Sequence, residues 1–173
     1  MRTVNAFEVL TQNGVITCFA RGNIKLNNLI RVGDIANIEA VGSEYVIKDI
    51  ANRKNCLIRP YVSNIDQLII LISTEPKPDF LLIDKLLISC VKNNITPIIV
   101  VNKSDIIDSQ FYISILNEYS PTVDNIILTS AKKLDGVSEL KTLLENNFSV
   151  FCGQSAVGKS SLINAINGNL NLK

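Results

Sequence analysis

The pattern of hydrophobic and polar positions changes once along the chain, near residue 62. Before that point, short runs rich in β-branched and aromatic residues alternate with turn residues such as Gln-Asn-Gly, Arg-Gly-Asn and Gly-Ser. Such runs, without a helical period, predict β-strands at residues 4–10, 14–20, 34–41 and 44–50. Four or five short strands within about 60 residues predict a small all-β barrel. An OB-fold is the leading candidate, because such barrels bind oligonucleotides, and an SH3-like barrel is the alternative.

From residue 67 onwards, nearly continuous apolar runs predict strands that are buried on both faces of a parallel sheet. These runs lie at residues 67–73, 96–102, 123–130 and 148–153. Segments with helical spacing follow them at residues 79–94, 105–120 and 135–147, and again after the last strand. This order predicts a doubly wound α/β fold. We therefore place one domain at residues 1–62 and a second at 63–173, with Pro60 in the connector ending the last barrel strand.

One stretch carries the clearest chemistry. Residues 153–161, GQSAVGKSS, match the phosphate-binding pattern G-x-x-x-x-G-K-[ST] at every fixed position, between a predicted strand and a predicted helix. Glycines let the loop wind tightly, so that backbone N–H groups surround an anion, and the helix N-terminus faces the same phosphates. Lys159 is expected to reach the β- and γ-phosphates, and the Ser160 hydroxyl to bind Mg²⁺. The stretch predicts a nucleoside-triphosphate site.

A second motif, Asn102-Lys103-Ser104-Asp105, follows a predicted strand, where ligands of open α/β sheets bind. The Asp105 carboxylate can accept hydrogen bonds from the N1–H and 2-amino groups of guanine, and adenine lacks this donor pair. Asn102 can serve the N7 edge of the base or tie its loop to the phosphate loop. The stem of Lys103 can lie along the base.

A third motif, Thr129-Ser130-Ala131-Lys132, follows the next predicted strand. The Ala131 N–H is expected to meet guanine O6, and the Lys132 stem to cover the other face of the base. Each short motif alone also fits an ordinary capped helix start, but three at successive strand ends predict GTP or GDP. The expected nucleotide contacts are Asn102, Lys103, Ser104, Asp105, Ser130, Ala131, Lys132, Gly153, Gln154, Ser155, Ala156, Val157, Gly158, Lys159, Ser160 and Ser161.

The order of these motifs is itself informative. An ordinary GTPase has the phosphate loop first, whereas here both guanine-specific motifs precede it, which indicates a circularly permuted P-loop GTPase domain. By analogy with an unpermuted GTPase sheet, the four predicted strands should then be parallel and contiguous. Their expected spatial order is fourth, first, second, third by position in the chain.

At this point the sequence resembles the permuted ribosome-assembly GTPases, specifically the small-ribosomal-subunit-dependent GTPase A family. The resemblance covers nearly the whole chain: the turns Ala-Arg-Gly and Val-Gly-Asp, the connector RKNCLIRPYVSNIDQ, and the segments TPIIVVNKSD, TSAK and GQSAVGKSSLIN. It implies a GTP-hydrolysing factor that docks on the small ribosomal subunit late in its maturation. It also implies that the barrel binds ribosomal RNA and that the subunit stimulates GTP hydrolysis.

The sequence departs from the family pattern in two ways. Ala156 stands where the family usually has glycine. Alanine fits there if its φ is negative, and we then expect weakened rather than lost phosphate contact. The switch threonine, the D-x-x-G loop and the zinc-binding domain of the family have no counterpart in the 173 residues. We therefore expect Zn²⁺ only in a part beyond them, assign no catalytic residue, and expect slow hydrolysis by this chain alone.

Charge adds a hint about the first domain. The formal net charge is only +1, but every arginine lies within residues 1–62. Arginine is the favoured side chain for bidentate phosphate contact, so this distribution favours RNA as a ligand of the first domain. Solvated loop charges on a small barrel would give the same composition. The candidate RNA contacts are Arg21, Arg31, Arg53 and Arg59.

Composition sets broad limits on the class of protein. No apolar run approaches the about 20 residues of a membrane span, no secretory signal opens the chain, and the four cysteines form no C-x-x-C pair. We expect a cytoplasmic protein with reduced thiols and no membrane partner. Two alternatives stay open: an RNA-binding module whose nucleotide domain only senses GTP and GDP, and an ATP-using P-loop enzyme, which Asp105 disfavours.

Overall fold

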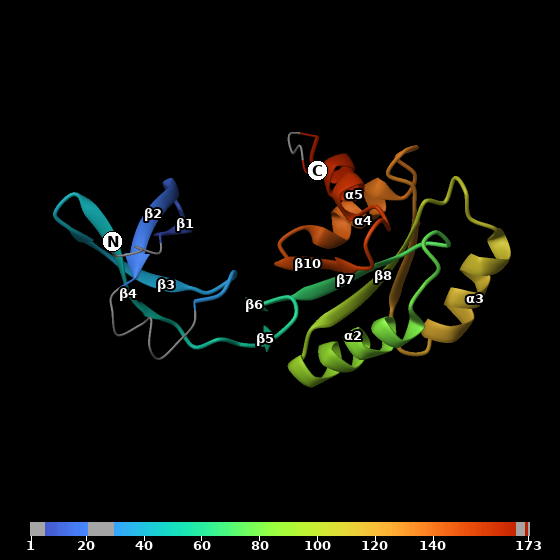
Figure 1. Ribbon diagram of the computed structural model, residues 1–173, viewed down its shortest axis with the longest axis horizontal. Coiled ribbons are helices and arrows are strands. Elements are labelled where there is room, and N and C mark those ends of the chain that lie inside the picture. Colours follow the sequence, from blue (N-terminus) through green and yellow to red (C-terminus); the bar gives the residue numbers. More distant parts are fainter. Residues whose placement is uncertain (1–5, 21–29, 169–171, 173) are drawn as a thin grey trace. The chain divides into compact units, whose positions relative to one another are not determined.

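The computed structural model describes residues 6–20, 30–168 and 172. The chain forms two compact units, residues 1–64 and residues 65–173. Figure 1 labels the elements of both. The described part of the first unit is built from strands, and the second unit is a sheet covered by helices.

Two β-hairpins make up the sheet of the first unit. Its strands are β1 (Ala6–Thr11), β2 (Gly14–Ala20), β3 (Ala36–Val41) and β4 (Glu44–Ile50), in the spatial order β1-β2-β4-β3. Gly14 and Gly42 have positive φ at the two tight turns, where glycine fits without strain. The central strands β2 and β4 pair in parallel, and Cys18 and Ile47 on them are fully buried. The four strands predicted from sequence are present, except that residues 4 and 5 lie outside the described residues.

The edges of this sheet bear on the predicted barrel. Among residues 6–20 and 30–50, β1 and β3 are the two outer strands. Closure of the sheet into an OB-fold therefore stays a prediction.

A small hairpin in the connector corrects the expectation for Pro60. The last strand of the four-stranded sheet ends at Ile50, whereas Pro60 lies in the turn between β5 (Cys56–Leu57) and β6 (Val62–Ser63). Strands of two residues are too short to give a hydrophobic period, so the sequence pattern does not reveal them. The hairpin is held within the first unit, because the Ser63 N–H donates to the Val32 carbonyl at 3.0 Å.

The second unit is a four-stranded parallel sheet. Its strands are β7 (Gln67–Ile72), β8 (Thr96–Asn102), β9 (Asn125–Thr129) and β10 (Ser149–Gly153), and their spatial order is β10-β7-β8-β9. The predicted order, with the fourth strand beside the first, is confirmed. β7 is buried along its whole length, as its continuous apolar sequence indicates.

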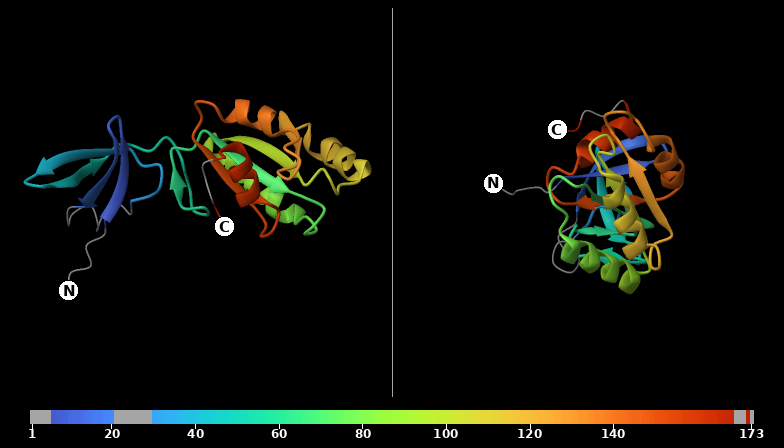
Figure 2. Two further views of the ribbon diagram at one scale, coloured as in Figure 1. Left: turned by 90° about the horizontal axis from the view of Figure 1, so that it is seen from above. Right: turned by 90° about the vertical axis from the view of Figure 1, so that its right-hand side faces the viewer.

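Helices cover both faces of this sheet. They are α2 (Phe80–Asn93), α3 (Ser109–Tyr119), α4 (Val137–Leu144) and α5 (Lys159–Ile166). Figures 1 and 2 show α2 and α5 on opposite sides of the strands. On the α4 and α5 side, Leu140 and Leu162 pack with alternate strand residues such as Ile69 and Ile98 into one buried cluster. This double-sided burial makes the sheet a rigid support for the loops at its carboxyl edge.

Local caps decide where the helices begin. Asp79 caps α2 by accepting from the Leu82 N–H at 3.1 Å, and Asp108 caps α3 by accepting from the Gln110 N–H at 3.2 Å. The helix expected from residue 105 therefore begins at Ser109, because Asp108 supplies the cap and leaves residues 103–108 as a loop. No helix among the described residues is long and apolar enough to cross a membrane.

Candidate nucleotide-binding site

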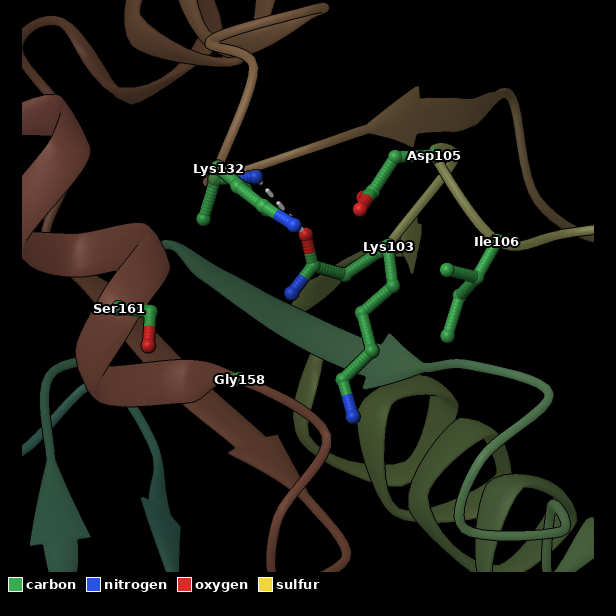
Figure 3. A pocket seen from close by; sticks show the side chains of 8 residues that line it. Lys103, Asp105, Ile106, Lys132, Gly158 and Ser161 are labelled. Atoms are coloured by element: carbon green, nitrogen blue, oxygen red, sulfur yellow. Dashed lines mark hydrogen bonds between the residues drawn. The ribbon is translucent and has the colours of Figure 1, made fainter.

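The three sequence motifs meet at the carboxyl edge of the parallel sheet. The phosphate loop joins β10 to α5, and the other two motifs follow β8 and β9. Between them lies a cavity of about 220 Å³, shown in Figure 3. Its lining residues are Asn102, Lys103, Asp105, Ile106, Ala131, Lys132, Gly158 and Ser161.

Glycine is required at both ends of the phosphate loop. A Cβ on Gly153 would lie 2.4 Å from the Leu71 carbonyl oxygen, and one on Gly158 would lie 2.4 Å from Nδ2 of Asn102. Both glycines also have positive φ, at +149° and +95°. The loop can pass so close to β7 and β8 only because these positions carry no side chain.

Ala156 corrects an expectation from the sequence. Its φ is +64°, in the left-handed region, so the negative φ under which alanine would fit is not present. The side chain is exposed, and the left-handed conformation places Cβ too close to the carbonyl oxygen of the backbone, which is unfavourable for alanine. Alanine therefore occupies a position whose geometry suits glycine.

Lys159 reaches back across the loop. Its Nζ donates to the Gly153 carbonyl at 2.9 Å and to the Gln154 carbonyl at 2.6 Å. The helix α5 that begins at Lys159 follows Gly158, and no side chain caps its N-terminus, in contrast to α2 and α3. An ammonium group and the N-terminal backbone amides of a helix thus share one loop, which is the arrangement that binds phosphate.

Asn102 links all three motifs. It is 1% exposed, and its Nδ2 donates to the Val157 carbonyl in the phosphate loop at 2.9 Å. Its Oδ1 accepts from the Thr129 hydroxyl at 3.1 Å and from the Ala131 N–H at 3.4 Å, the bond drawn in Figure 3. Of the two roles considered for Asn102, the structure shows the one that ties the loops together.

Asp105 is positioned by the third motif. The buried Ser130 donates its hydroxyl to Oδ1 of Asp105 at 2.8 Å, and the same hydroxyl accepts from the Lys133 N–H at 3.1 Å. The hydrogen bond from Ser130, together with the nearby charges of Lys132 and Lys133, lowers the pKa of Asp105 below its ordinary value. The site therefore presents a carboxylate whose remaining lone pairs can accept from a base.

Lys103 bridges two loops. It has a φ of +69°, and its Nζ donates to the Ala156 carbonyl at 2.8 Å and to the Glu75 carbonyl at 2.7 Å. The stem of the side chain lines the cavity, consistent with a place beside a planar ligand.

The remaining predicted contacts fall into three groups. Ala131, Lys132, Gly158 and Ser161 line the cavity, while Ser104 donates its N–H to the Thr129 carbonyl at 2.9 Å and supports the loop from outside. Gln154, Ser155, Ala156, Val157, Lys159 and Ser160 lie in the adjoining loop and the first turn of α5 and are not part of the cavity wall.

Sequence reasoning missed two features of the site. Ile106 lines the cavity although 56% of its surface is exposed, so it offers an apolar wall next to Asp105. An apolar residue in the loop directly after the N-K-x-D motif is the signal that could have revealed it. The loop at residues 73–79 also contacts the phosphate loop through Gln154 and Lys103. No local pattern in the sequence points to these contacts.

A family model described as RsgA GTPase matches residues 50–173. The chain belongs to the RsgA GTPase family. A relative named small ribosomal subunit biogenesis GTPase RsgA, from Caldanaerobacter subterraneus subsp. tengcongensis, is 39% identical over 170 residues, which cover 96% of this chain and 58% of the relative. The resemblance inferred from the sequence is confirmed.

Solved structures of the family agree with the fold. YjeQ from Thermotoga maritima has a TM-score of 0.83 and 37% identity, with coverage of 98% of this chain and 63% of that one. YloQ, described as a circularly permuted GTPase, has a TM-score of 0.73 and 32% identity, with coverage of 97% and 62%. The chain spans less than two thirds of each of these relatives. The order of motifs in this chain agrees with the description of YloQ as circularly permuted.

The candidate RNA-binding arginines lie in different surroundings. The Arg31 guanidinium stacks 4.0 Å from the centre of the Tyr61 ring and donates from Nη1 to the Leu57 carbonyl at 3.0 Å. Arg53 forms a two-pronged ion pair with Asp34, at 2.7 Å and 2.8 Å. Arg59 is exposed in the turn between β5 and β6, and Arg21 lies outside the described residues.

Asp34 explains why Arg53 is held so firmly. Burial alone would raise the pKa of this carboxyl, but hydrogen bonds from Arg53, Ser63 and the Arg31 N–H outweigh burial and lower the pKa. The carboxylate joins the connector to the loop before β3.

The chemistry of the loop suits a hard cation bound together with phosphate. Ser160, at the start of α5, carries a hydroxyl oxygen, and Mg²⁺ prefers oxygen ligands from side chains and phosphates. Within the described residues, no three His, Cys, Asp or Glu side chains cluster as a metal site.

A larger cavity of about 500 Å³ lies on the α2 and α3 side of the second unit. Apolar residues of α2, among them Leu87, Ile88 and Val91, form much of its wall. It contains none of the motif residues, so the nucleotide site is assigned to the smaller cavity.

Proposed function

We propose that this chain is the guanine-nucleotide-binding and RNA-binding part of a GTP-hydrolysing factor that acts in late maturation of the small ribosomal subunit. The names of relatives in the RsgA GTPase family support the pathway. The observation that carries the nucleotide assignment is the convergence of Asp105, Asn102 and the phosphate loop on one cavity.

The base is selected by hydrogen-bond matching. Ser130 holds Asp105 as a carboxylate that accepts from guanine N1–H and the 2-amino group. Adenine would leave that carboxylate without a donor, which costs most where water is excluded. We propose that the Ala131 N–H, which donates to Asn102 Oδ1 at a long 3.4 Å, also meets O6 of the base. Lys103, Lys132 and Ile106, which line the cavity, would supply the surfaces beside the ring.

The phosphates are bound by charge and backbone geometry. Lys159 already points at the loop interior, and the uncapped start of α5 adds N–H donors and a partial positive charge. Ser160 would hold Mg²⁺, which supplies neutralisation of the phosphate charge. Hydrolysis is proposed for the whole protein, and we assign no water-positioning residue within this chain.

A base-exchange experiment tests the nucleotide assignment. Asp105→Asn replaces an acceptor by a mixed amide, so affinity for GTP should fall about 100-fold, while affinity for XTP should rise. Competition binding with GTP, XTP and ATP measures this, with Asp124→Asn in an exposed position as the matched control. Unchanged GTP affinity in the Asp105 variant would disprove the assignment.

Measurement of GTP turnover distinguishes a GTP-hydrolysing enzyme from a protein that only binds GTP and GDP. The full-length gene product should hydrolyse GTP faster when small ribosomal subunits are added. Binding of GTP without any turnover, with or without subunits, would favour the alternative of an RNA-binding module with a non-catalytic nucleotide domain.

The first unit is proposed to be an OB-fold that binds ribosomal RNA. Its strand order, with two hairpins joined by a parallel pair, is compatible with part of such a barrel. Because Arg31 and Arg53 have partners within the protein, the exposed Arg59 is the described arginine best placed to contact phosphate. Arg59→Ala should reduce the slope of log K against log [salt] for RNA binding by about 0.7–0.9. An unchanged slope would remove Arg59 from the interface.

A further inference from the structure

The loop at residues 73–79, which joins β7 to α2, is fastened to the phosphate loop by side chains of two predicted nucleotide contacts. Gln154 bonds to the backbone of Lys77 and Asp79, and Lys103 bonds to the backbone of Glu75. Gln154 lies 75 residues after Asp79 and 77 residues after Lys77 in the sequence. The roles assigned to these motifs in nucleotide binding explain neither of these two connections to residues 73–79.

We infer that Gln154 is a positioning residue that holds the phosphate loop against residues 73–79 in the conformation that binds the diphosphate of the nucleotide. The inference rests on the proposed function, because it assumes that the loop binds phosphate. It adds a requirement for tight binding that lies outside the phosphate-contacting groups.

The side-chain amide of Gln154 matches its partners on both of its polar atoms. Oε1 accepts from the Asp79 N–H at 2.9 Å, and Nε2 donates to the Lys77 carbonyl at 3.1 Å. A carboxylate could accept but not donate, and a shorter amide would not span the same gap. Both bonds go to backbone groups, so they depend on Gln154 and not on the side chains at residues 77 and 79.

The partner loop is held firmly enough to serve as a support. The buried Ser73 donates its hydroxyl to the Glu75 carbonyl at 2.6 Å, and Lys103 donates to the same carbonyl. Asp79, which bonds to Gln154, also caps α2 through the Leu82 N–H. The phosphate loop is thereby connected to the end of β7 and to the first turn of α2.

The contact bears on phosphate binding through Lys159. The Gln154 carbonyl accepts from Lys159 Nζ at 2.6 Å, so a displacement of Gln154 moves one of the two groups that aim the lysine. Ala156, two residues after Gln154 in the chain, has a strained φ of +64°. Its carbonyl accepts a hydrogen bond from Lys103. A strained residue persists where its surroundings fix it, and here Gln154 and Lys103 fix the backbone on either side.

This role predicts a split between ligands. Guanosine uses the base-binding side of the cavity, whereas GDP also uses the phosphate loop. Gln154→Leu, which keeps the size of the side chain but removes both hydrogen bonds, should weaken GDP binding about tenfold and change guanosine binding less than about twofold. A purely structural role would weaken both ligands together.

The test is competition against fluorescent GDP with guanosine and GDP, using the 173-residue chain. Gln110→Leu, at an exposed position in the first turn of α3, is the matched control and should leave both affinities unchanged. Equal effects of Gln154→Leu on both ligands, or no effect on either, would overturn the inference alone. A wild-type chain that binds no guanine nucleotide would overturn the proposed function as well.

A second measurement needs no variant. Because coupling is reciprocal, GDP binding to the wild-type chain should slow amide hydrogen exchange in residues 73–79, including the Asp79 N–H. Exchange that stays the same when GDP is saturating would contradict the inference, even if Gln154→Leu does not fold.

Discussion

The two sides of the candidate site are built by different means. On the phosphate side, the loop depends on backbone conformation, with positive φ at Gly153, Ala156 and Gly158. On the base side, the geometry depends on side-chain hydrogen bonds, because the buried Asn102 and Ser130 hold the loops and orient Asp105. Substitutions should therefore act through main-chain geometry on the first side and through lost hydrogen bonds or charge on the second.

The largest effect is expected at Lys159, whose side chain brings a positive charge to the phosphate side. Lys159→Ala removes a cation from the loop, so GDP and GTP affinity should fall about 100-fold, which corresponds to about 2.7 kcal/mol. The thermal midpoint should change little, because among the described residues the lysine bonds only to carbonyls of its own loop. Isothermal titration, with the exposed Lys141→Ala as control, measures the effect. Unaltered affinity would contradict the assignment of the phosphate side.

Gly158→Ala should disturb both sides at once. The new Cβ would meet Nδ2 of Asn102 and would sit at a φ of +95°, so the loop must move away from Asn102. We expect GDP affinity to fall about tenfold and the free energy of unfolding to fall by about 2 kcal/mol. Gly168→Ala, where a Cβ would meet nothing within 4 Å, is the matched control. If the two variants behave alike in chemical denaturation and GDP titration, the close approach to Asn102 is unimportant.

Ser130→Ala tests the base side and has a pH signature. Ser130 lowers the pKa of Asp105, so in the wild-type chain the carboxylate stays ionised to a pH below its ordinary range. Without the hydroxyl the pKa rises, and binding that needs the carboxylate is lost at a higher pH during acid titration. At neutral pH, GDP affinity should fall only about fivefold. Ser138→Ala on α4 is the control. If GDP affinity falls at the same acidic pH in Ser130→Ala as in the wild-type chain, this role for Ser130 is excluded.

The sequence predicted those parts of the fold that have a long, uniform environment. β7 and β8 are buried on both faces, so their apolar runs left a clear signal, and the motif order fixed the strand order. The hairpin of β5 and β6 was missed, since strands of two residues have no period. The positive φ of Ala156 could not be read from the sequence, because alanine favours negative values and only the folded loop imposes a positive one.

The sequence predicted the motif residues of the candidate site, but it did not predict the contacts that hold their loops in place. Most residues that line the cavity stand at fixed positions of the three motifs, whereas Lys159 and Ser160 lie in the adjoining loop and Ile106 lies outside the motifs. The contacts of Gln154 with Lys77 and Asp79 join loops that only the folded sheet brings together. Long-range contacts between irregular segments leave no periodic trace in a single sequence.

The smallest expected effect on binding is at Ala156, and it distinguishes two origins of the phosphate-loop geometry. If Gln154 and Lys103 keep the loop preformed, the strain at Ala156 is present with and without nucleotide. Ala156→Gly should then raise the free energy of unfolding by about 1 kcal/mol and change GDP affinity less than about twofold, because the relief is the same in both states. Denaturant unfolding and GDP titration on the same samples measure both quantities. A several-fold gain in GDP affinity with unchanged stability would mean that the nucleotide imposes the strained conformation.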